Sequence, residues 1–316
     1  MIKHEAPGQK YTFKKKSAGF AITLIKVLFL IAICFVILYP LLMKTVASFM
    51  NIDDVYDPMV RYIPKHFTLD NFSRTMQLLN YGKSLVNSLI LVGITSLITV
   101  ASCTISSYGL ARFKFKGNNF LFIMALLSLV VTPDILLVPY YLQFRFFDFF
   151  WILQLFAGKT INLSENFASF FILGGVCMGL KNGLYIFILR QFFRGMPKEL
   201  EEAAYVDGSG LFRTFAKVML PGSVPMMVTV FLFSFVFSWL DVIYTPVFLS
   251  NTDVLPTQFG MLVHPGLGVH VGIQTEVEFS LLRNAGMILL ILPLVVLYLF
   301  AQKSFVQSIE RSGLTG

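Results

Sequence analysis

Charged residues are scarce in this chain. Only 13% of its 316 residues are Asp, Glu, Lys or Arg, whereas 56% are apolar. Ordinary soluble domains carry about 25% charged residues, so this composition excludes a typical soluble globular protein. Several apolar runs are close to the length of about 20 residues that crosses a bilayer as a helix. The chain is therefore expected to be an all-α, multi-pass integral membrane protein.

Cysteine and histidine are also rare, with three and four residues respectively. Cys34, Cys103 and Cys177 lie in apolar segments without the spacing of metal ligands. We therefore expect small buried packing residues and no metal site. The histidines all lie outside the apolar runs. A proton relay through a membrane usually needs buried ionisable groups, so this placement argues against one.

The sequence lacks a G-x-x-x-x-G-K-[ST] phosphate loop. The chain is therefore not expected to be an enzyme or to hold a cofactor, and any ATP hydrolysis must come from a separate protein. Its net charge of +8 comes from scattered Lys and Arg residues, not from a basic stripe interleaved with aromatics. The preference of these residues for cytoplasmic segments explains the charge, so no nucleic-acid partner is expected.

Six apolar runs are expected to be membrane-spanning helices, because lipid offers no partners to unpaired backbone groups. Lys and Arg are more frequent on the segments that would be cytoplasmic if both termini were inside, which predicts an N-in, C-in orientation. A cleaved signal peptide is the alternative for the first run, but that run is longer than the usual core of about 7–15 residues. The predicted spans are 26–43, 84–110, 120–141, 168–193, 224–244 and 284–302.

This pattern predicts a single transmembrane domain over residues 26–302. Residues 1–25 form a cytoplasmic N-terminal segment and residues 303–316 a cytoplasmic tail. Membrane lipid surrounds the domain. Within it, residues 194–222 form a polar segment between two strongly apolar runs, on the predicted cytoplasmic side.

The first half of this polar segment reads as a short helix. Pro197 suits the first turn of a helix, where its missing N–H has no partner to lose. Three acidic residues follow, near the positive end of the helix dipole. Asp207-Gly208 then ends the helix, because glycine readily takes the left-handed conformation of a C-terminal cap. The acidic residues are Glu199, Glu201 and Glu202, and a narrow apolar stripe is formed by Leu200, Ala203 and Ala204.

The second half predicts another helix, with Phe212, Phe215 and Met219 on one stripe. Leu220-Pro221 marks a bend before the fifth span. The segment as a whole has the form of a compact element that docks on another protein. The alternative is a solvated loop between helices whose Glu-Glu-Ala-Ala stretch is simply a good helix former.

These motifs resemble the cytoplasmic coupling loop, or EAA loop, of ABC-importer permeases. Glu202-Ala203-Ala204, Asp207-Gly208 and Leu220-Pro221 stand in that order and at that spacing. Three further stretches are similar to the carbohydrate-uptake branch of these permeases, in particular to the smaller subunit of the maltose type. They are Ser107–Phe113 (SYGLARF), Trp239-Leu240-Asp241 and the tail from Gln302 to Gly316.

The resemblance implies a permease subunit of an ATP-driven importer for an oligosaccharide or related glycan, in the bacterial cytoplasmic (inner) membrane. Its implied partners are a second homologous permease subunit in a heterodimer, two cytoplasmic ATPase subunits that bind ATP and Mg, and an extracytoplasmic sugar-binding protein. The implied coupling residues are Glu202, Ala203, Ala204, Asp207, Gly208, Leu220 and Pro221. Ser312, Gly313, Leu314, Thr315 and Gly316 would reach the ATPase dimer.

Polar residues inside or near the spans are candidates for the sugar path. Charges at such depth usually face a cavity or pair with each other. The alternatives are that the charges pair or cap broken helices, and that the aromatics anchor the protein at the interface. Glycines around Lys181 also predict a broken or closely packed fourth helix. The candidates are Asp134, Lys181, Tyr185, Trp239 and Asp241.

Two other classes of protein compete with this interpretation. An ion-coupled secondary transporter would work without an ATPase and would need a buried ion site, for example around Asp134 or Asp241. A membrane-embedded hydrolase or transferase would need a nucleophile with its base, or a metal cluster, at membrane depth. The sequence offers no such constellation.

Overall fold

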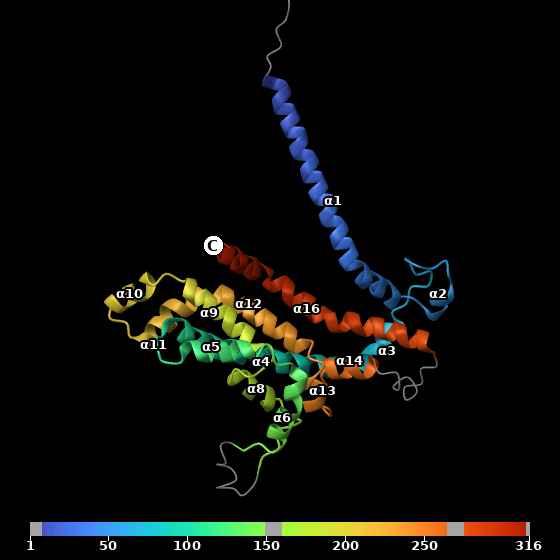
Figure 1. The fold of residues 1–316 in the computed structure, drawn as a ribbon. Helices are drawn as coiled ribbons and strands as arrows, with labels where there is room; N and C mark the ends of the chain where they lie inside the picture. Colours follow the sequence, from blue (N-terminus) through green and yellow to red (C-terminus); the bar gives the residue numbers. More distant parts are fainter. Residues whose placement is uncertain (1–7, 149–159, 264–274, 314–316) are drawn as a thin grey trace, which may run out of the picture. The chain divides into compact units, whose positions relative to one another are not determined.

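The structure is a computed structural model that describes residues 8–148, 160–263 and 275–313. The regular secondary structure of these residues is helical, with only two isolated β-bridges, so the all-α prediction is confirmed for them (Figure 1). The chain divides into two compact units. The first is Met1–Phe72 with Thr275–Ala285, and the second is Ser73–Gln274 with Gly286–Gly316.

Four helices among the described residues are long and apolar enough to cross a membrane. They fall on the first, second, fifth and sixth predicted spans. These segments are Ile22–Ser48 within α1 (Gly8–Ser48), α4 (Tyr81–Arg112), Leu211–Trp239 and Glu276–Lys303 within α16 (Glu276–Gly313).

The third predicted span is two helices, α5 (Asn118–Leu127) and α6 (Pro133–Arg145), so the single helix expected over 120–141 is wrong (Figure 1). Pro133 is the cause. A residue before proline is biased towards extended backbone, and Thr132 is extended, with ψ 144°. Proline itself fits the first turn of a new helix. The count of six spans therefore stays a prediction.

The fourth predicted span is also broken, as the glycines around Lys181 predicted. It consists of α8 (Ala168–Gly175) and α9 (Asn182–Gly195). Cys177 and Lys181, in the connection, have φ of 58° and 59°, a left-handed conformation that cannot continue a right-handed helix. A Cβ atom on Gly183 would lie 2.1 Å from the carbonyl oxygen of Ala125, so only glycine allows α9 to approach α5 this closely.

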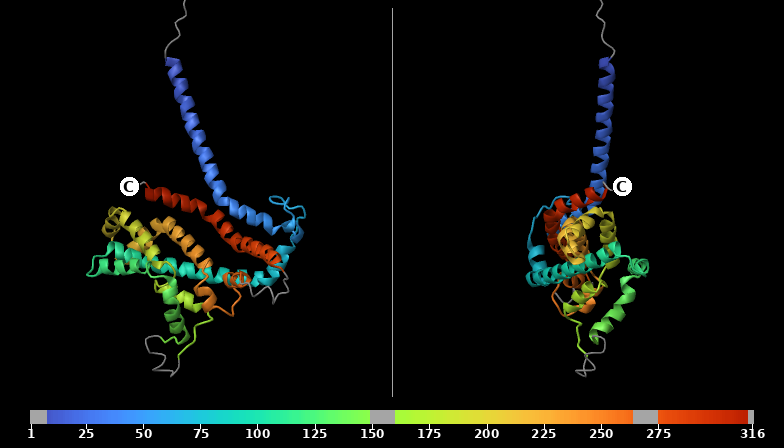
Figure 2. Two further views of the ribbon diagram at one scale, coloured as in Figure 1. Left: turned by 45° about the vertical axis from the view of Figure 1, so that its right-hand side comes forward. Right: turned by 90° about the vertical axis from the view of Figure 1, so that its left-hand side faces the viewer.

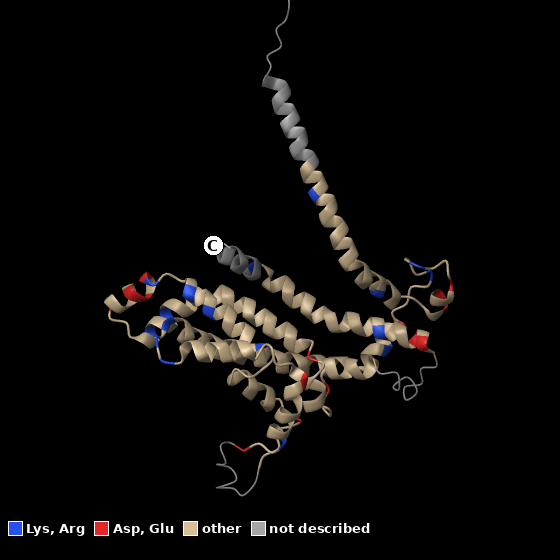
Figure 3. Ribbon diagram, viewed as in Figure 1, with Lys and Arg blue, Asp and Glu red and all other residues tan. Residues whose placement is uncertain are grey.

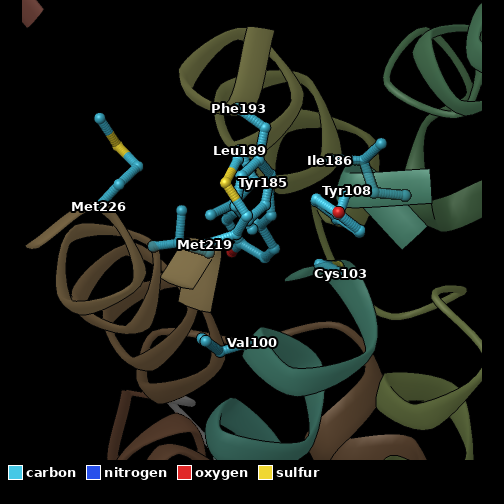
Figure 4. Close-up of a cluster of buried hydrophobic side chains, with 10 residues drawn as sticks. Val100, Cys103, Tyr108, Tyr185, Ile186, Leu189, Phe193, Met219 and Met226 are labelled. Atoms are coloured by element: carbon cyan, nitrogen blue, oxygen red, sulfur yellow. The ribbon is translucent and has the colours of Figure 1, made fainter. Parts of the chain in front are cut away.

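The second unit is built around α4, which packs against α8, α9 and α12 (Leu220–Trp239) (Figure 2). Buried side chains from α4, α9, α12 and the turn just before α12 form one cluster of its core (Figure 4). The cluster includes Cys103, Tyr108, Tyr185, Phe193 and Met219. The expectation that all cysteines are buried holds only for Cys103, since Cys177 is half-buried and Cys34 is exposed among the apolar side chains of α1.

The first unit contains α1, α2 (Ile52–Tyr56) and the start of α3 (Asp70–Leu78). Buried Asp54 accepts hydrogen bonds from the backbone N–H of His66, at 2.8 Å, and lies 2.7 Å from its ring Nδ1. Asn71 donates from Nδ2 to the carbonyls of Ser48 (3.0 Å) and Met50 (2.8 Å). These contacts fix the path of the chain after α1.

In the second unit, the segment between α13 (Tyr244–Phe248) and α14 (Leu255–Val263) is held by the start of α4. Ser88 Oγ accepts from the N–H of Leu255 at 2.8 Å, and Asn87 donates to the carbonyl of Asp253 at 2.9 Å. The hydrogen bond from the Lys83 ammonium holds the pKa of Asp253 below its usual range. The stabilisation that this hydrogen bond gives the folded state is present at neutral pH. It is lost as the pH falls through the lowered pKa of Asp253.

We expect Ser88→Ala to lower the free energy of unfolding by about 1–3 kcal/mol, because it leaves the buried N–H of Leu255 without an acceptor. Thermal unfolding of the purified chain in detergent measures this loss. Ser128→Ala is the control, since the exposed Ser128 hydroxyl bonds only to a carbonyl of its own helical segment and should change stability by less than about 0.5 kcal/mol. Equal stability of the two variants would show that the hydrogen bond between Leu255 and Ser88 does not stabilise the fold.

Candidate functional site

The polar segment 194–222 forms two short helices joined by a turn. Its first helix is α10 (Glu199–Val206), with Glu199, Glu201 and Glu202 in the first turn, as predicted. Pro197 lies before this helix and not in it, because the N-cap is Lys198. The three carboxylates therefore stand at the positive end of the helix dipole.

The end of α10 is a Schellman motif. Gly208 has φ 78°, its N–H donates to the carbonyl of Tyr205 at 3.0 Å, and the N–H of Ser209 donates to the carbonyl of Ala204 at 2.9 Å. These bonds satisfy carbonyls that the helix end would leave unpaired. The predicted stop at Asp207-Gly208 is confirmed, and it reverses the chain towards the next helix.

The second half is α11 (Leu211–Thr214) followed by a π-turn (Phe215–Met219) that leads into α12. The expected common stripe is wrong: Phe212 is 83% exposed, Phe215 is half-buried and Met219 is fully buried. The wide π-turn changes the angular spacing of the side chains, so the three do not share one face. Pro221, in the first turn of α12, cannot supply the ordinary i to i−4 bond, which explains an irregular turn before it.

A buried carboxylate fixes this loop to the end of α4. Glu201 is only 8% exposed and accepts a hydrogen bond from the hydroxyl of Tyr108 at 2.9 Å. Its Oε2 lies 3.4 Å from Nε of Arg112. Arg112 also donates from Nη2 to the carbonyl of Met196 at 2.7 Å. Tyr108 and Arg112 are four residues apart on one helix and therefore share a face.

The ring of Tyr108 adds an apolar contact to this anchor (Figure 4). Its centroid lies 5.6 Å from that of Phe113, 5.5 Å from that of Phe193 and 4.7 Å from that of Phe215. One tyrosine thus joins the end of α4, the end of α9 and the π-turn. Tyr108, Arg112 and Glu201 are hereafter the anchor.

The loop also exposes apolar side chains, which we call the tip surface. They lie on α10 and α11, and two of them are more than 80% exposed. Exposed apolar patches rimmed by polar residues mark sites of protein association. The tip surface consists of Leu200, Tyr205, Val206, Leu211 and Phe212.

The predicted coupling residues divide between exposed and buried positions. Ala204 is buried and Leu220 is half-buried, so both pack within this chain. Five others remain accessible to a partner. These are Glu202, Ala203, Asp207, Gly208 and Pro221.

Sequence reasoning missed the anchor. In the sequence, Tyr108 and Arg112 stand out only as part of a family stretch, and Glu201 only as one of three acidic residues. A signal was present: an aromatic and a basic residue at i and i+4 end an apolar span, and a glutamate pair follows in the next loop on the same predicted side. Such a charge pair is the usual way to keep a carboxylate buried.

Three of the five candidates for the sugar path make packing contacts or hydrogen bonds within this chain in this conformation. Trp239 is fully buried, donates from Nε1 to the carbonyl of Leu290 at 3.0 Å and stacks on Phe235 at 5.6 Å. Tyr185 is fully buried in the cluster of Figure 4. The carboxylate of Asp241 accepts from the backbone N–H groups of residues 243, 244 and 245 and from the hydroxyl of Thr245. It thereby caps α13, which is the structural alternative.

Asp134 and Lys181 are exposed, and Lys181 and Asp241 line different cavities. Lys181 lines a cleft of about 620 Å³ between α5, α6 and the break before α9, together with Tyr140 and Tyr244. Asp241 lines a separate cavity of about 30 Å³ beside α4, which has room for about one water molecule. A sugar path through these residues stays a prediction.

The predicted ATPase-contacting tail is only partly described. Ser312 and Gly313 lie in the last turn of α16. Leu314, Thr315 and Gly316 lie outside the described residues. The role of the tail stays a prediction.

Comparisons with known proteins bear on the whole chain. Residues 107–311 match the family model described as "Binding-protein-dependent transport system inner membrane component". This range includes the anchor, the tip surface and most of α16.

Individual relatives match over nearly their full length. The probable ABC transporter permease protein YurM of Bacillus subtilis is 30% identical over 295 residues, covering 92% of this chain and 86% of that protein. The arabinooligosaccharides transport system permease protein AraQ of Halalkalibacterium halodurans is 28% identical over 293 residues, covering 90% and 93%. The maltodextrin transport system permease protein MdxG of Bacillus subtilis is 26% identical over 292 residues, covering 92% and 95%.

A solved structure shares the fold. A chain in the crystal structure of a bacterial ABC transporter involved in the import of the acidic polysaccharide alginate matches with a TM-score of 0.67 at 18% identity. The match covers 96% of this chain and 100% of that chain.

The adjacent residues Glu201 and Glu202 provide a matched test of the anchor. Glu201→Ala should loosen the loop, because removing one partner of a buried ion pair costs roughly 3–5 kcal/mol. We expect trypsin to cleave the full-length chain after Lys198 or Arg213 at least about tenfold faster than in the wild type, since cleavage follows local opening. Glu202→Ala, which removes an exposed carboxylate, should leave the rate unchanged. Equal cleavage of both variants would show that Glu201 does not hold the loop.

Proposed function

Because the chain belongs to the family of binding-protein-dependent transport system inner membrane components, we propose that it is the permease subunit of an ATP-driven importer for an oligosaccharide or related glycan. Relatives named for arabinooligosaccharides and maltodextrin support this substrate class. The proposal places the chain in the bacterial cytoplasmic membrane, with six spans and both termini inside.

The observation that carries the coupling role is an apolar tip surface on a loop that is rigidly anchored behind it. Phe212 and Val206 are 83% and 87% exposed, while Glu201 in the same loop is buried and bonded to Tyr108 of α4. An exposed apolar surface on a polar loop is stabilised by covering it with a partner. A rigid anchor then passes the partner's movement to the helices behind the loop, because a loosely held loop would absorb it.

The proposed partner at the tip surface is a cytoplasmic ATPase that binds ATP and Mg, present in two copies. A second homologous permease completes the translocation path as a heterodimer, and an extracytoplasmic sugar-binding protein delivers the glycan. ATP closes the ATPase dimer, the coupling loops approach each other, and the path opens towards the binding protein. This chain contributes mechanical coupling and half of the path, and its partner hydrolyses ATP.

Phe212→Glu should abolish docking without unfolding the chain, because Phe212 is 83% exposed. We expect the variant to be produced at the wild-type level, but to capture at least tenfold less ATPase and to lose ATP-dependent glycan uptake in cells. The captured protein is identified by mass spectrometry through its own phosphate loop. Glu202→Arg should act in the same direction.

Asp53→Lys is the control, since Asp53 is exposed on α2 and far along the chain from the loop. It should leave ATPase capture intact. Wild-type capture and uptake by Phe212→Glu and Glu202→Arg would overturn the coupling role. Uptake that needs an ion gradient and no ATP would instead establish the ion-coupled transporter.

A further inference from the structure

A cleft beside the anchor gathers positive charge without any carboxylate in its lining. It has a volume of about 640 Å³ and lies where the connection from α4 to α5 meets the end of α9. Pockets of this size hold small molecules or large polar groups. Its cationic lining residues are Lys114, Lys116, Arg190 and Arg194.

One of these cations is fixed in place. Arg190 is 6% exposed, donates from Nε to the carbonyl of Leu110 at 3.1 Å, and lies with its guanidinium 3.8 Å from the ring centre of Phe122. The other three are exposed. Among the described residues, no ion pair involves any of the four. The cleft therefore presents uncompensated positive charge around one buried, oriented guanidinium.

Aromatic side chains accompany this charge. Phe113, Phe115 and Phe120 also line the cleft and are 42%, 45% and 62% exposed. Figure 3 shows basic residues at the end of the second unit that carries α10, α11 and the start of α5. Basic residues interleaved with exposed rings at the end of membrane-spanning helices fit the boundary between headgroups and acyl chains. The preference of Lys and Arg for cytoplasmic loops explains why basic residues occur in this connection. It does not explain why four of them line the same cleft.

We propose that this cleft binds the phosphate headgroup of an anionic phospholipid from the leaflet on the side of the coupling loop. Basic pockets at the cytoplasmic ends of membrane helices recognise such headgroups. Arginine suits phosphate because its planar donors can bind two oxygens at once. The sidedness of the site rests on the proposed function, but the binding itself does not need the ATPase. A bound lipid would brace the end of α9 just before the coupling loop.

The test compares two charge-matched double variants of the full chain in nanodiscs that contain phosphatidylcholine and phosphatidylglycerol. Lys114→Gln with Lys116→Gln removes two charges from the cleft. Lys26→Gln with Lys303→Gln removes two exposed charges elsewhere, on α1 and α16. Native mass spectrometry then counts the phosphatidylglycerol molecules retained by each protein.

We expect the cleft variant to retain phosphatidylglycerol about thirtyfold less tightly than the wild type, because each of the two basic residues contributes roughly 1 kcal/mol near an anionic surface. The control variant should retain it like the wild type. Equal loss in both variants, or retention unchanged in the cleft variant, overturns the proposal. Competition by millimolar inorganic phosphate would also overturn it, because the ligand would then be a free anion and not a lipid.

ATPase capture by the same variants separates this proposal from the proposed function. Loss of lipid with retained ATPase capture supports the lipid site alone. Lipid retained by the cleft variant, together with loss of ATPase by Phe212→Glu, would leave the coupling role standing and remove the lipid site.

Discussion

The position of the polar segment 194–222 depends on one buried carboxylate, that of Glu201. Glu201 is held between the hydroxyl of Tyr108 and the guanidinium of Arg112, and Arg112 reaches on to the backbone of Met196. Burying such a charge is unfavourable unless it is paired and hydrogen-bonded. The same groups that satisfy it therefore also determine where α10 lies. With α10 fixed, the Gly208 turn directs the chain into α11 and on to α12, and the apolar side chains of the tip surface stay exposed.

The helices that precede and follow the loop also satisfy their polar groups within the chain. Where a span is interrupted, a side chain or a special backbone conformation satisfies the break. Asp241 caps α13, Pro133 starts α6 without an N–H to satisfy, and left-handed Cys177 and Lys181 separate α8 from α9. Irregular backbone at membrane depth is tolerated only where protein or water surrounds it. The break between α8 and α9 borders the cleft of about 620 Å³ that Lys181 and Tyr140 line.

Sequence reasoning succeeded where the cause is local. Apolar runs predicted the four long helices, and Asp207-Gly208 predicted the end of α10, because glycine's conformational freedom acts within one turn. It failed where the cause is distant. Glu201 and Glu202 are chemically identical neighbours. Glu201 is the buried one because Tyr108 and Arg112, far earlier in the chain, lie beside it. Pro221 predicted a bend, but one proline does not specify a π-turn. The third span was predicted from its hydropathy across Pro133, although that proline starts a new helix.

Helix α9 joins the loop to the break at Lys181 and is short, with 14 residues. At 1.5 Å per residue it is a rod of about 21 Å. At one end Phe193 is packed against Tyr108, and at the other Gly183 touches α5 with no room for a methyl group. A helix that packs this closely at both ends has little room to shift relative to its neighbours. In the proposed coupling, a displacement of the tip surface therefore reaches the break at Cys177–Lys181 through one short helix that is packed at both ends.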